Sequence, residues 1–182
     1  MDRKPYFAVT DITLTSVFCA LWVALSLTLG RVSFALTGLP ILHDFAVFFT
    51  LLLVTWATGK FGTATLVAMV GSAILFLIGI PPLNIITLGF AASAPVFDGL
   101  MSLNRHKLTG KPYNLSVAVL STVVSAYSAG VVIGVFFMNR PFDWVLTVWG
   151  GWHIVGGIIT LAVTVPVKGA LEKANVRRIK GA

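Results

Sequence analysis

Two short groups of residues in this sequence carry side chains suited to holding a small molecule. The first group is the adjacent pair His43 and Asp44, an imidazole beside a carboxylate. The second contains Trp149, Trp152 and His153, whose spacings of three and four residues can place them on one helical face. Flat indole rings can enclose a planar ligand, while an imidazole fixes its orientation by a hydrogen bond. Both groups are therefore candidates for a ligand-binding pocket.

The same residues also admit a purely structural interpretation. The tryptophans could form an interfacial belt, and His153 could satisfy a contact between helices. Asp44 could pair with Arg31 or Arg140 and only stabilise the outer rim. His43, Asp44 and His153 are ligand types that transition metals accept, but their spacing is not specific to a metal site. We predict no metal, no cofactor, and these substrate-binding residues: Arg31, His43, Asp44, Asn84, Trp149, Trp152 and His153.

The composition excludes an ordinary soluble domain. Of the 182 residues, 57% are hydrophobic and 10% are charged, with a mean hydropathy of +0.95. The single cysteine, Cys19, excludes an intrachain disulfide and a cysteine-rich metal site. In a soluble protein, a net charge of +7 would suggest binding to nucleic acid. In a membrane protein, the excess of lysine and arginine instead reflects the orientation of the chain in the membrane. We expect no nucleic-acid partner.

Six apolar segments must position the candidate residues. At about 1.5 Å rise per residue, such segments cross the roughly 30 Å hydrocarbon core of a bilayer. Residues 59–62 form a tight turn, the prolines at 81–82 end a helix, and a loop containing Arg31 and Pro40 follows the first span. We predict an all-α integral membrane protein, a six-transmembrane-helix bundle forming one domain over 1–182. The spans are about 10–30, 39–58, 63–80, 83–103, 115–138 and 144–167.

Lysine and arginine predict the orientation of this bundle. Of the 13 such residues, all except Arg31 and Arg140 fall in segments that six spans place on the side of the two termini. Cytoplasmic segments are enriched in lysine and arginine, so we predict cytoplasmic termini in a multi-pass protein of the cell membrane. The candidate binding residues then lie toward the outer surface. The basic tail after Lys168 is suited to attraction by anionic lipids.

Asp98 is a separate acidic residue, about one turn from the cytoplasmic end of the fourth predicted span. An intramembrane carboxylate can serve as a proton relay. It can equally pair with Arg105 or cap a neighbouring helix. The sequence leaves these roles open.

Small residues recur at helical spacing in three spans. Ala20 and Ala24 lie one turn apart in the first span, and Gly130 and Gly134 form a GxxxG in the fifth. A third stripe is Ala64, Ala68 and Ser72. Because small side chains let neighbouring helices approach closely, such stripes hold membrane bundles together. The first-span pair also predicts a docking surface for another helix, with incidental packing as the alternative.

The length, the six spans, the cytoplasmic termini and the AxxxA of the first span resemble the substrate-binding (S) component of an energy-coupling factor (ECF) transporter. The most telling stretches are ALWVA at 20–24 and ATGKFGTATLVAMVGS at 57–72. The resemblance implies that Ala20 and Ala24 pack against a membrane T component, which is joined to two ATPase subunits. It also implies a small-molecule ligand such as a vitamin, bound at the outer side under the loop between helices one and two. The N-terminus lacks the MHIPDG-type start of the cobalt and nickel members, and no ligand signature matches.

This resemblance implies transport without chemistry on the ligand, so we predict no enzymatic activity. The chain would bind its ligand outside, associate with the ATP-driven module, and topple in the membrane to release it. The sequence has no GxxxxGK[ST] loop, so the ATPase must be another chain. It also lacks a GxSxG serine nucleophile, and Asp98 lacks the further aspartates of metal-dependent phosphotransfer. The alternative is an autonomous ion-coupled transporter or channel, with Asp98 or His153 as the proton carrier.

Overall fold

The apolar segments form helices that begin and end close to the glycines and prolines in the sequence. The computed structural model describes residues 5–174, and these residues contain no β-strand. The helices are α1 (Val9–Leu25), α2 (Arg31–Thr37), α3 (Ile41–Thr58), α4 (Thr63–Ile78), α5 (Leu83–Met101), α6 (Pro112–Val132), α7 (Phe142–Trp144) and α8 (Gly150–Lys173). Three π-helical stretches (Ser26–Gly30, Ile133–Phe137 and Val145–Trp149) and a 3₁₀ turn (Ser102–Asn104) extend them.

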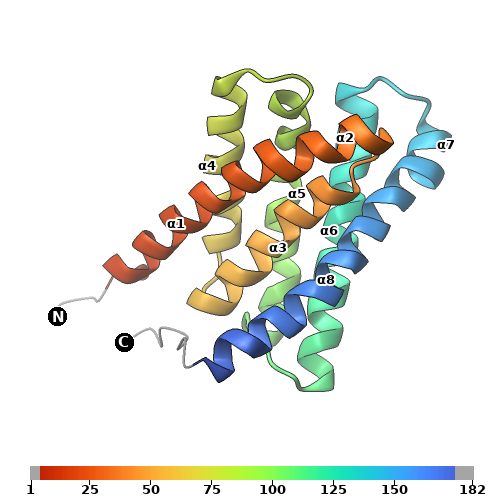
Figure 1. Cartoon of the computed structure of the whole chain (residues 1–182). Coiled ribbons are helices and arrows are strands. Elements are labelled where there is room, and N and C mark those ends of the chain that lie inside the picture. Colours follow the sequence, from red (N-terminus) through yellow and green to blue (C-terminus); the bar gives the residue numbers. More distant parts are fainter. Residues whose placement is uncertain (1–4, 175–182) are drawn as a thin grey trace.

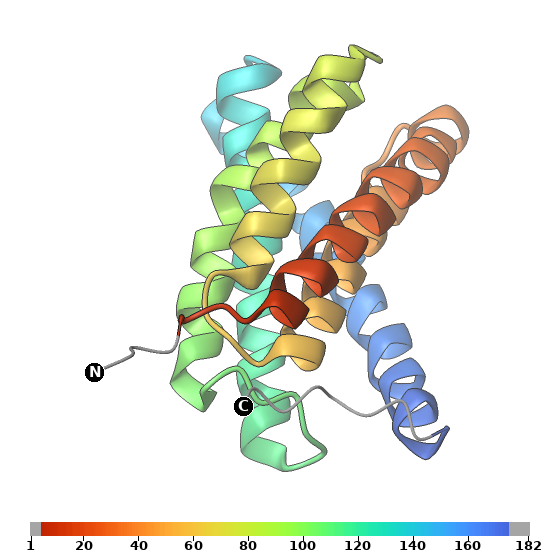
Figure 2. The same cartoon turned by 90° about the vertical axis from the view of Figure 1, so that its left-hand side faces the viewer.

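The long helices are arranged in two layers (Figures 1 and 2). Helices α1, α3 and α8 run side by side and tilted in one layer, while α4, α5 and α6 form the other. The layers are joined at their edges, where α1 packs on α4 and α6 packs on α8. This arrangement places the start of α3 close to the first turns of α8, although the two segments are far apart in the sequence.

Helix α3 is the most enclosed element of the bundle. Fourteen of its eighteen residues are buried, among them Phe48, Leu51 and Val54. Because nearly every face of α3 meets another helix, most of its side chains are apolar. The polar pair at its start, His43 and Asp44, is therefore carried into the interior.

Five helical segments are long and apolar enough to cross a membrane: Val9–Thr37, Ile41–Thr58, Leu83–Asn104, Pro112–Phe137 and Phe142–Lys173. Helix α4 is apolar but has only 16 residues. The chain is thus a multi-pass membrane protein by helix length and composition, and it has the helical-bundle class predicted from the sequence. Six crossings and a single domain remain predictions.

The predicted loop after the first span is wrong. Helix continues from Val9 through Gly30 and Arg31 to Thr37, and only residues 38–40 connect it to α3. Gly30 does not break the helix; a Cβ there would lie 3.1 Å from Cδ2 of His43, so its role is close packing. The helix ends instead at Gly38, whose φ of +67° is readily adopted by glycine.

The two ends of the bundle differ in charge. The α3–α4 turn and the α5–α6 connection lie at the lower end in Figure 1, together with the end of α8. These segments carry most of the lysines and arginines in the described chain. The connections α2–α3, α4–α5 and α6–α7 lie at the upper end, near Arg31 and Arg140. The separation is that expected of a membrane protein, and the cytoplasmic assignment of the lower end remains a prediction.

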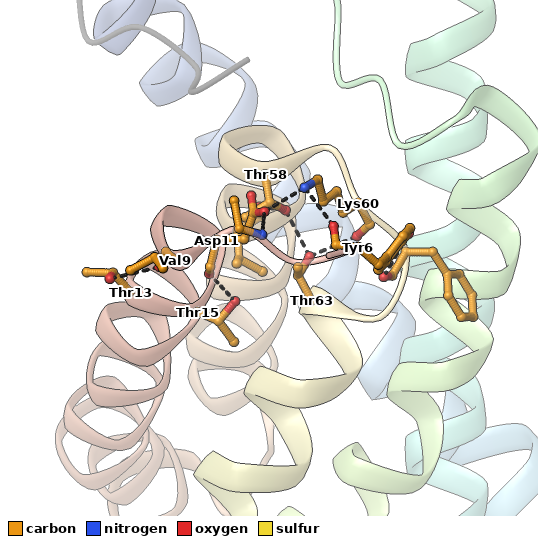
Figure 3. A network of polar contacts seen from close by, with 11 residues as sticks. Tyr6, Val9, Asp11, Thr13, Thr15, Thr58, Lys60 and Thr63 are labelled. Atoms are coloured by element: carbon orange, nitrogen blue, oxygen red, sulfur yellow. Dashed lines mark hydrogen bonds and ion pairs between the residues drawn. The ribbon is translucent and has the colours of Figure 1, made fainter. Parts of the chain in front are cut away.

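A polar network fastens the start of α1 to the α3–α4 turn (Figure 3). The ammonium of Lys60 lies 2.6 Å from Oδ2 of Asp11 and donates to the carbonyl of Tyr6 at 2.9 Å. The same Asp11 oxygen accepts the backbone N–H of Ala8 at 2.8 Å. Across the turn, the hydroxyls of Thr58 and Thr63 lie 2.9 Å apart. The buried Asp11 is therefore neutralised by the turn that it holds in place.

Candidate functional site

A buried hydrogen-bonded pair joins the second helical span to the last. Nδ1 of His153, on α8, lies 2.7 Å from Oδ1 of Asp44, on the first turn of α3. Both side chains are fully buried. One proton lies between the two atoms, donated either by Nδ1–H of His153 or by a protonated Asp44. Asp44 therefore pairs with His153, and the predicted alternatives, Arg31 and Arg140, are not its partners.

His43 lies beside this pair and is linked to it by Phe90 of α5. The phenyl ring of Phe90 has its centroid 5.0 Å from that of His43 and 5.8 Å from that of His153. His43 is fully buried, and neither of its ring nitrogens has a hydrogen-bond partner within residues 5–174. The two imidazoles thus flank one aromatic ring inside the bundle.

Aromatic rings extend the cluster in both directions. The indole of Trp149 lies edge-on to His153 with centroids 5.3 Å apart, and it stacks on Trp144 at 5.8 Å. On the other side, Phe34 of α2 meets His43 at 6.1 Å. The residues that we call the imidazole cluster are Phe34, His43, Asp44, Phe90, Trp149 and His153.

Two glycines make room for the Asp44–His153 pair. A Cβ at Gly156 would lie 2.5 Å from Cβ of Asp44, and one at Gly130 would lie 2.5 Å from Cδ2 of His153. Neighbouring Gly134 likewise faces Val145 and Trp149. The GxxxG of α6 therefore holds the helix against the last span of the same chain, as predicted for bundle packing.

Several buried polar atoms of the cluster, and one of Asn84, have no hydrogen-bond partner within residues 5–174. They are Oδ2 of Asp44, Nε2 of His153, both ring nitrogens of His43, Nε1 of Trp149 and Oδ1 of Asn84. A buried donor or acceptor without a partner costs about 1–3 kcal/mol, so such groups are rare in packed interiors. The unpartnered atoms of the cluster provide hydrogen-bonding capacity that a polar ligand could satisfy.

The π-helical stretches border this cluster. Ser26–Gly30 ends where Gly30 meets His43, and Val145–Trp149 ends on Trp149 itself. Ile133–Phe137 contains Gly134, which packs on Trp149. Single π-helical turns occur often at functional sites, because the extra residue re-aims the side chains around it.

The structure separates the predicted site residues into two sets. His43, Asp44, Trp149 and His153 meet in the cluster, and half-buried Asn84 has a buried oxygen. Trp152 is 36% exposed, and Arg31 is exposed on α2. Neither Trp152 nor Arg31 belongs to the imidazole cluster. The described residues contain no group of three or more His, Cys, Asp or Glu side chains placed to hold a metal ion.

The first-span alanines occupy a different surface. Ala20 and Ala24 are exposed, on the face of α1 that carries exposed Ser16 and Thr28 at the same four-residue spacing. Beside Ala20, a cavity of about 360 Å³ lies between α1 and α4. Its walls include Ser16 and Ala20, with Leu66 and Val70 opposite. This side of α1 is smooth and unoccupied by any other helix of the described chain.

Asp98 caps a helix, one of the roles that the sequence left open. Its Oδ2 accepts the backbone N–H of Thr65 at 2.8 Å and the hydroxyl of the same residue. Thr65 lies in the first turn of α4. The N-cap residue of this helix, Gly62, has no side chain that could accept these hydrogen bonds. The ring of His106 lies 3.5 Å from the other carboxylate oxygen. Arg105 is not its partner.

Phe90, Phe34 and Trp144 were missed by the sequence reasoning. Each lies in an apolar helix in which an aromatic residue is ordinary, so residue type gives no signal. Only the rotation of α2 and α5 about their axes turns Phe34 and Phe90 toward His43.

No family model and no curated protein matches this sequence. Among solved structures, the chain is similar to one described as an S-component of an ECF transporter. The TM-score is 0.68, the superposition covers 93% of this chain and 88% of the other, and 17% of the residues are identical. At that identity the likeness shows a shared fold alone. The fold expected from the sequence resemblance is confirmed.

Proposed function

We propose that this chain is the membrane-embedded substrate-binding subunit of an ATP-driven importer of the ECF type, located in the cell membrane. The observation that carries the proposal is the S-component fold, shared over 93% of the chain. The cargo is a vitamin or another small micronutrient. The chain performs no chemistry on it and has no catalytic residues.

The imidazole cluster is the proposed substrate site. Its rings offer apolar surfaces, and the unpartnered atoms of His43, Asp44 and His153 offer hydrogen bonds among fully buried side chains. Binding sites for small molecules combine these features: apolar walls and a few convergent polar groups. Asn84, at the start of α5, is proposed as a further polar residue of the site. Trp152 and Arg31 face away from the cluster and are left out of the proposed site.

The exposed face of α1 is the proposed docking surface for the T component. Ala20 and Ala24 leave only methyl groups between the α1 backbone and an approaching helix. In lipid, close packing of this kind is a main source of attraction between helices. The groove toward α4 extends the same surface. Two ATPase subunits, carried by the T component, would supply the energy.

Affinity purification from the native membrane tests the proposal directly. The tagged chain should retain a T component and two ATPases, and mass spectrometry of the same sample should identify the bound small molecule. Uptake of that molecule should stop when the ATPases are depleted and persist when a protonophore collapses the proton gradient. The reverse dependence would favour an autonomous ion-coupled transporter, for which the buried Asp44–His153 pair would be a natural proton carrier.

A further inference from the structure

A second cavity, besides the one between α1 and α4, is formed where α5 connects to α6. This connection lies at the lower end of the bundle (Figures 1 and 2). The volume of the cavity is about 470 Å³. Three cationic side chains line it: Arg105, Lys107 and Lys111. The remaining walls include Thr109, Tyr113 and Asn114. The proposed transport function does not use this cavity.

The three cations have no acidic partner among the residues that the structure describes. Within residues 5–174, no carboxylate lies within ion-pair distance of Arg105, Lys107 or Lys111. The nearest acid along the chain, Asp98, is fully buried and already bound to Thr65. Three exposed positive charges that converge on one hollow without compensation repel one another, and an anion placed between them would relieve that repulsion.

Hydrogen bonds hold the walls of the cavity in place. The side chain of Asn104 accepts the N–H of Lys107 at 3.2 Å and donates to its carbonyl at 3.0 Å. The amide of Asn114 donates to the hydroxyl of Thr109 at 2.6 Å, and the hydroxyl of Tyr113 donates to the carbonyl of Leu103 at 3.0 Å. The cations therefore project from a braced loop, and little ordering would be needed on binding.

The start of α6 adds to the positive potential. This helix of 21 residues begins at Pro112, with Lys111 at its N-cap and no side chain capping its first N–H groups. Free N–H groups at a helix start favour a negative charge. Leu103, 58% exposed, and Tyr113, 62% exposed, flank the cavity on the ends of α5 and α6. An aromatic and an apolar side chain at this level are typical of the boundary between lipid tails and headgroups.

We infer that this cavity binds a phosphate group at the membrane surface, carried by an anionic phospholipid or by soluble phosphate. Arg105 offers a planar fork for two phosphate oxygens, while Lys107 and Lys111 supply point charges. Orientation in the membrane requires only that lysine and arginine be enriched on one side. It does not require three of them to line one cavity whose walls are held by hydrogen bonds.

Native mass spectrometry of the purified full-length chain tests this site, because orientation in the membrane plays no part in detergent. The chain is titrated separately with phosphatidylglycerol, phosphatidylcholine and inorganic phosphate. Phosphatidylglycerol should bind more tightly than zwitterionic phosphatidylcholine. Each of Arg105→Gln, Lys107→Gln and Lys111→Gln should weaken it about fivefold, as expected for the loss of one interfacial cation. Lys107→Arg should retain binding.

Lys173→Gln is the matched control, since Lys173 is an exposed cation near the end of α8 and outside the cavity. It should leave the affinity unchanged. Equal weakening by Lys173→Gln, or no weakening by the three cavity variants, would mean diffuse attraction and would overturn the inference. Inorganic phosphate that binds with the same sensitivity to the cavity variants, while phosphatidylglycerol does not bind, would assign the site to soluble phosphate. Circular dichroism of each variant checks that the helices are intact.

Discussion

Asp44 and His153 are 109 residues apart in the sequence, yet their side chains meet at 2.7 Å in the fully buried interior. The pair joins the start of α3 to α8. Gly156 packs against Asp44 and Gly130 packs against His153. The pair is therefore a structural link between two spans as well as the centre of the proposed substrate site.

Removal of either partner should destabilise the protein. Asp44→Ala or His153→Ala leaves a buried polar group without its partner, which typically costs about 3–5 kcal/mol. The double variant should lose less than the sum of the two single variants, because it removes both members of one interaction. The free energy of unfolding, measured in mixed detergent micelles, gives this coupling. Asp143→Ala, at an exposed acid of α7, is the control, and additive losses would show that the pair contributes nothing specific.

The location of this pair shows what the sequence could predict and what it could not. The apolar segments and their glycine and proline boundaries locate the long helices closely, because helix length and hydropathy are local properties. The partner of Asp44 depends on how α3 and α8 are rotated and packed, which is a long-range property. Sequence reasoning proposed Arg31 or Arg140, and neither is the partner.

The same limit applies within one helix. Trp149 and Trp152 are four and one residues from His153, and helical spacing alone allows either to be the inner residue. The packed structure buries Trp149 and exposes Trp152. The first span is predicted to end at residue 30, before the charged Arg31, but the helix continues to Thr37 and Gly30 packs against His43.

Trp149→Ala should weaken substrate binding. Its ring lies 5.3 Å from that of His153, so its loss removes an aromatic wall of the proposed site. Loss of such a contact, with its burial, should reduce affinity about tenfold. The measurement is a titration with the compound identified in the purified chain. Trp152→Ala removes an indole of equal size from an exposed position and should change the affinity less than twofold. A larger effect at Trp152 than at Trp149 would move the site to the outer face of α8.

Asp98→Asn should distinguish a helix cap from a proton relay. An asparagine oxygen can still accept the N–H of Thr65, so the free energy of unfolding should fall by less than about 1 kcal/mol. Asp98→Ala removes the acceptor and should cost about 1–2 kcal/mol. Uptake by the folded protein should survive both changes. Abolished uptake in Asp98→Asn, with normal stability, would identify a titrating carboxylate and support the ion-coupled alternative.

The predicted orientation can be measured by cysteine labelling. In a Cys19→Ser background, cysteine at position 140 should react with an impermeant thiol reagent on intact cells, while cysteine at position 107 should not. The two positions lie in connections at opposite ends of the bundle, so one of them must be inaccessible if the bundle spans the membrane. Labelling at position 107 and protection at position 140 would invert the predicted topology.

Substitution on the exposed face of α1 should separate substrate binding from transport. Ala20→Trp and Ala24→Trp each place an indole where the proposed docking surface requires only a methyl group, so they should block close approach of the T component. Both residues are exposed, and neither is part of the imidazole cluster. Uptake should therefore be abolished while the purified variant binds its substrate with unchanged affinity.

Val119→Trp provides the matched control for this last experiment. Val119 is an exposed residue of α6, in the other helical layer, so the same indole there should meet lipid and leave uptake intact. Co-purification of the T component should be lost with the α1 variants and retained with the control. Transport that survives both α1 substitutions would make the alanines ordinary packing residues and remove the docking proposal. Loss of uptake with Val119→Trp as well would show that any added bulk on the bundle surface impairs transport, whichever helix carries it.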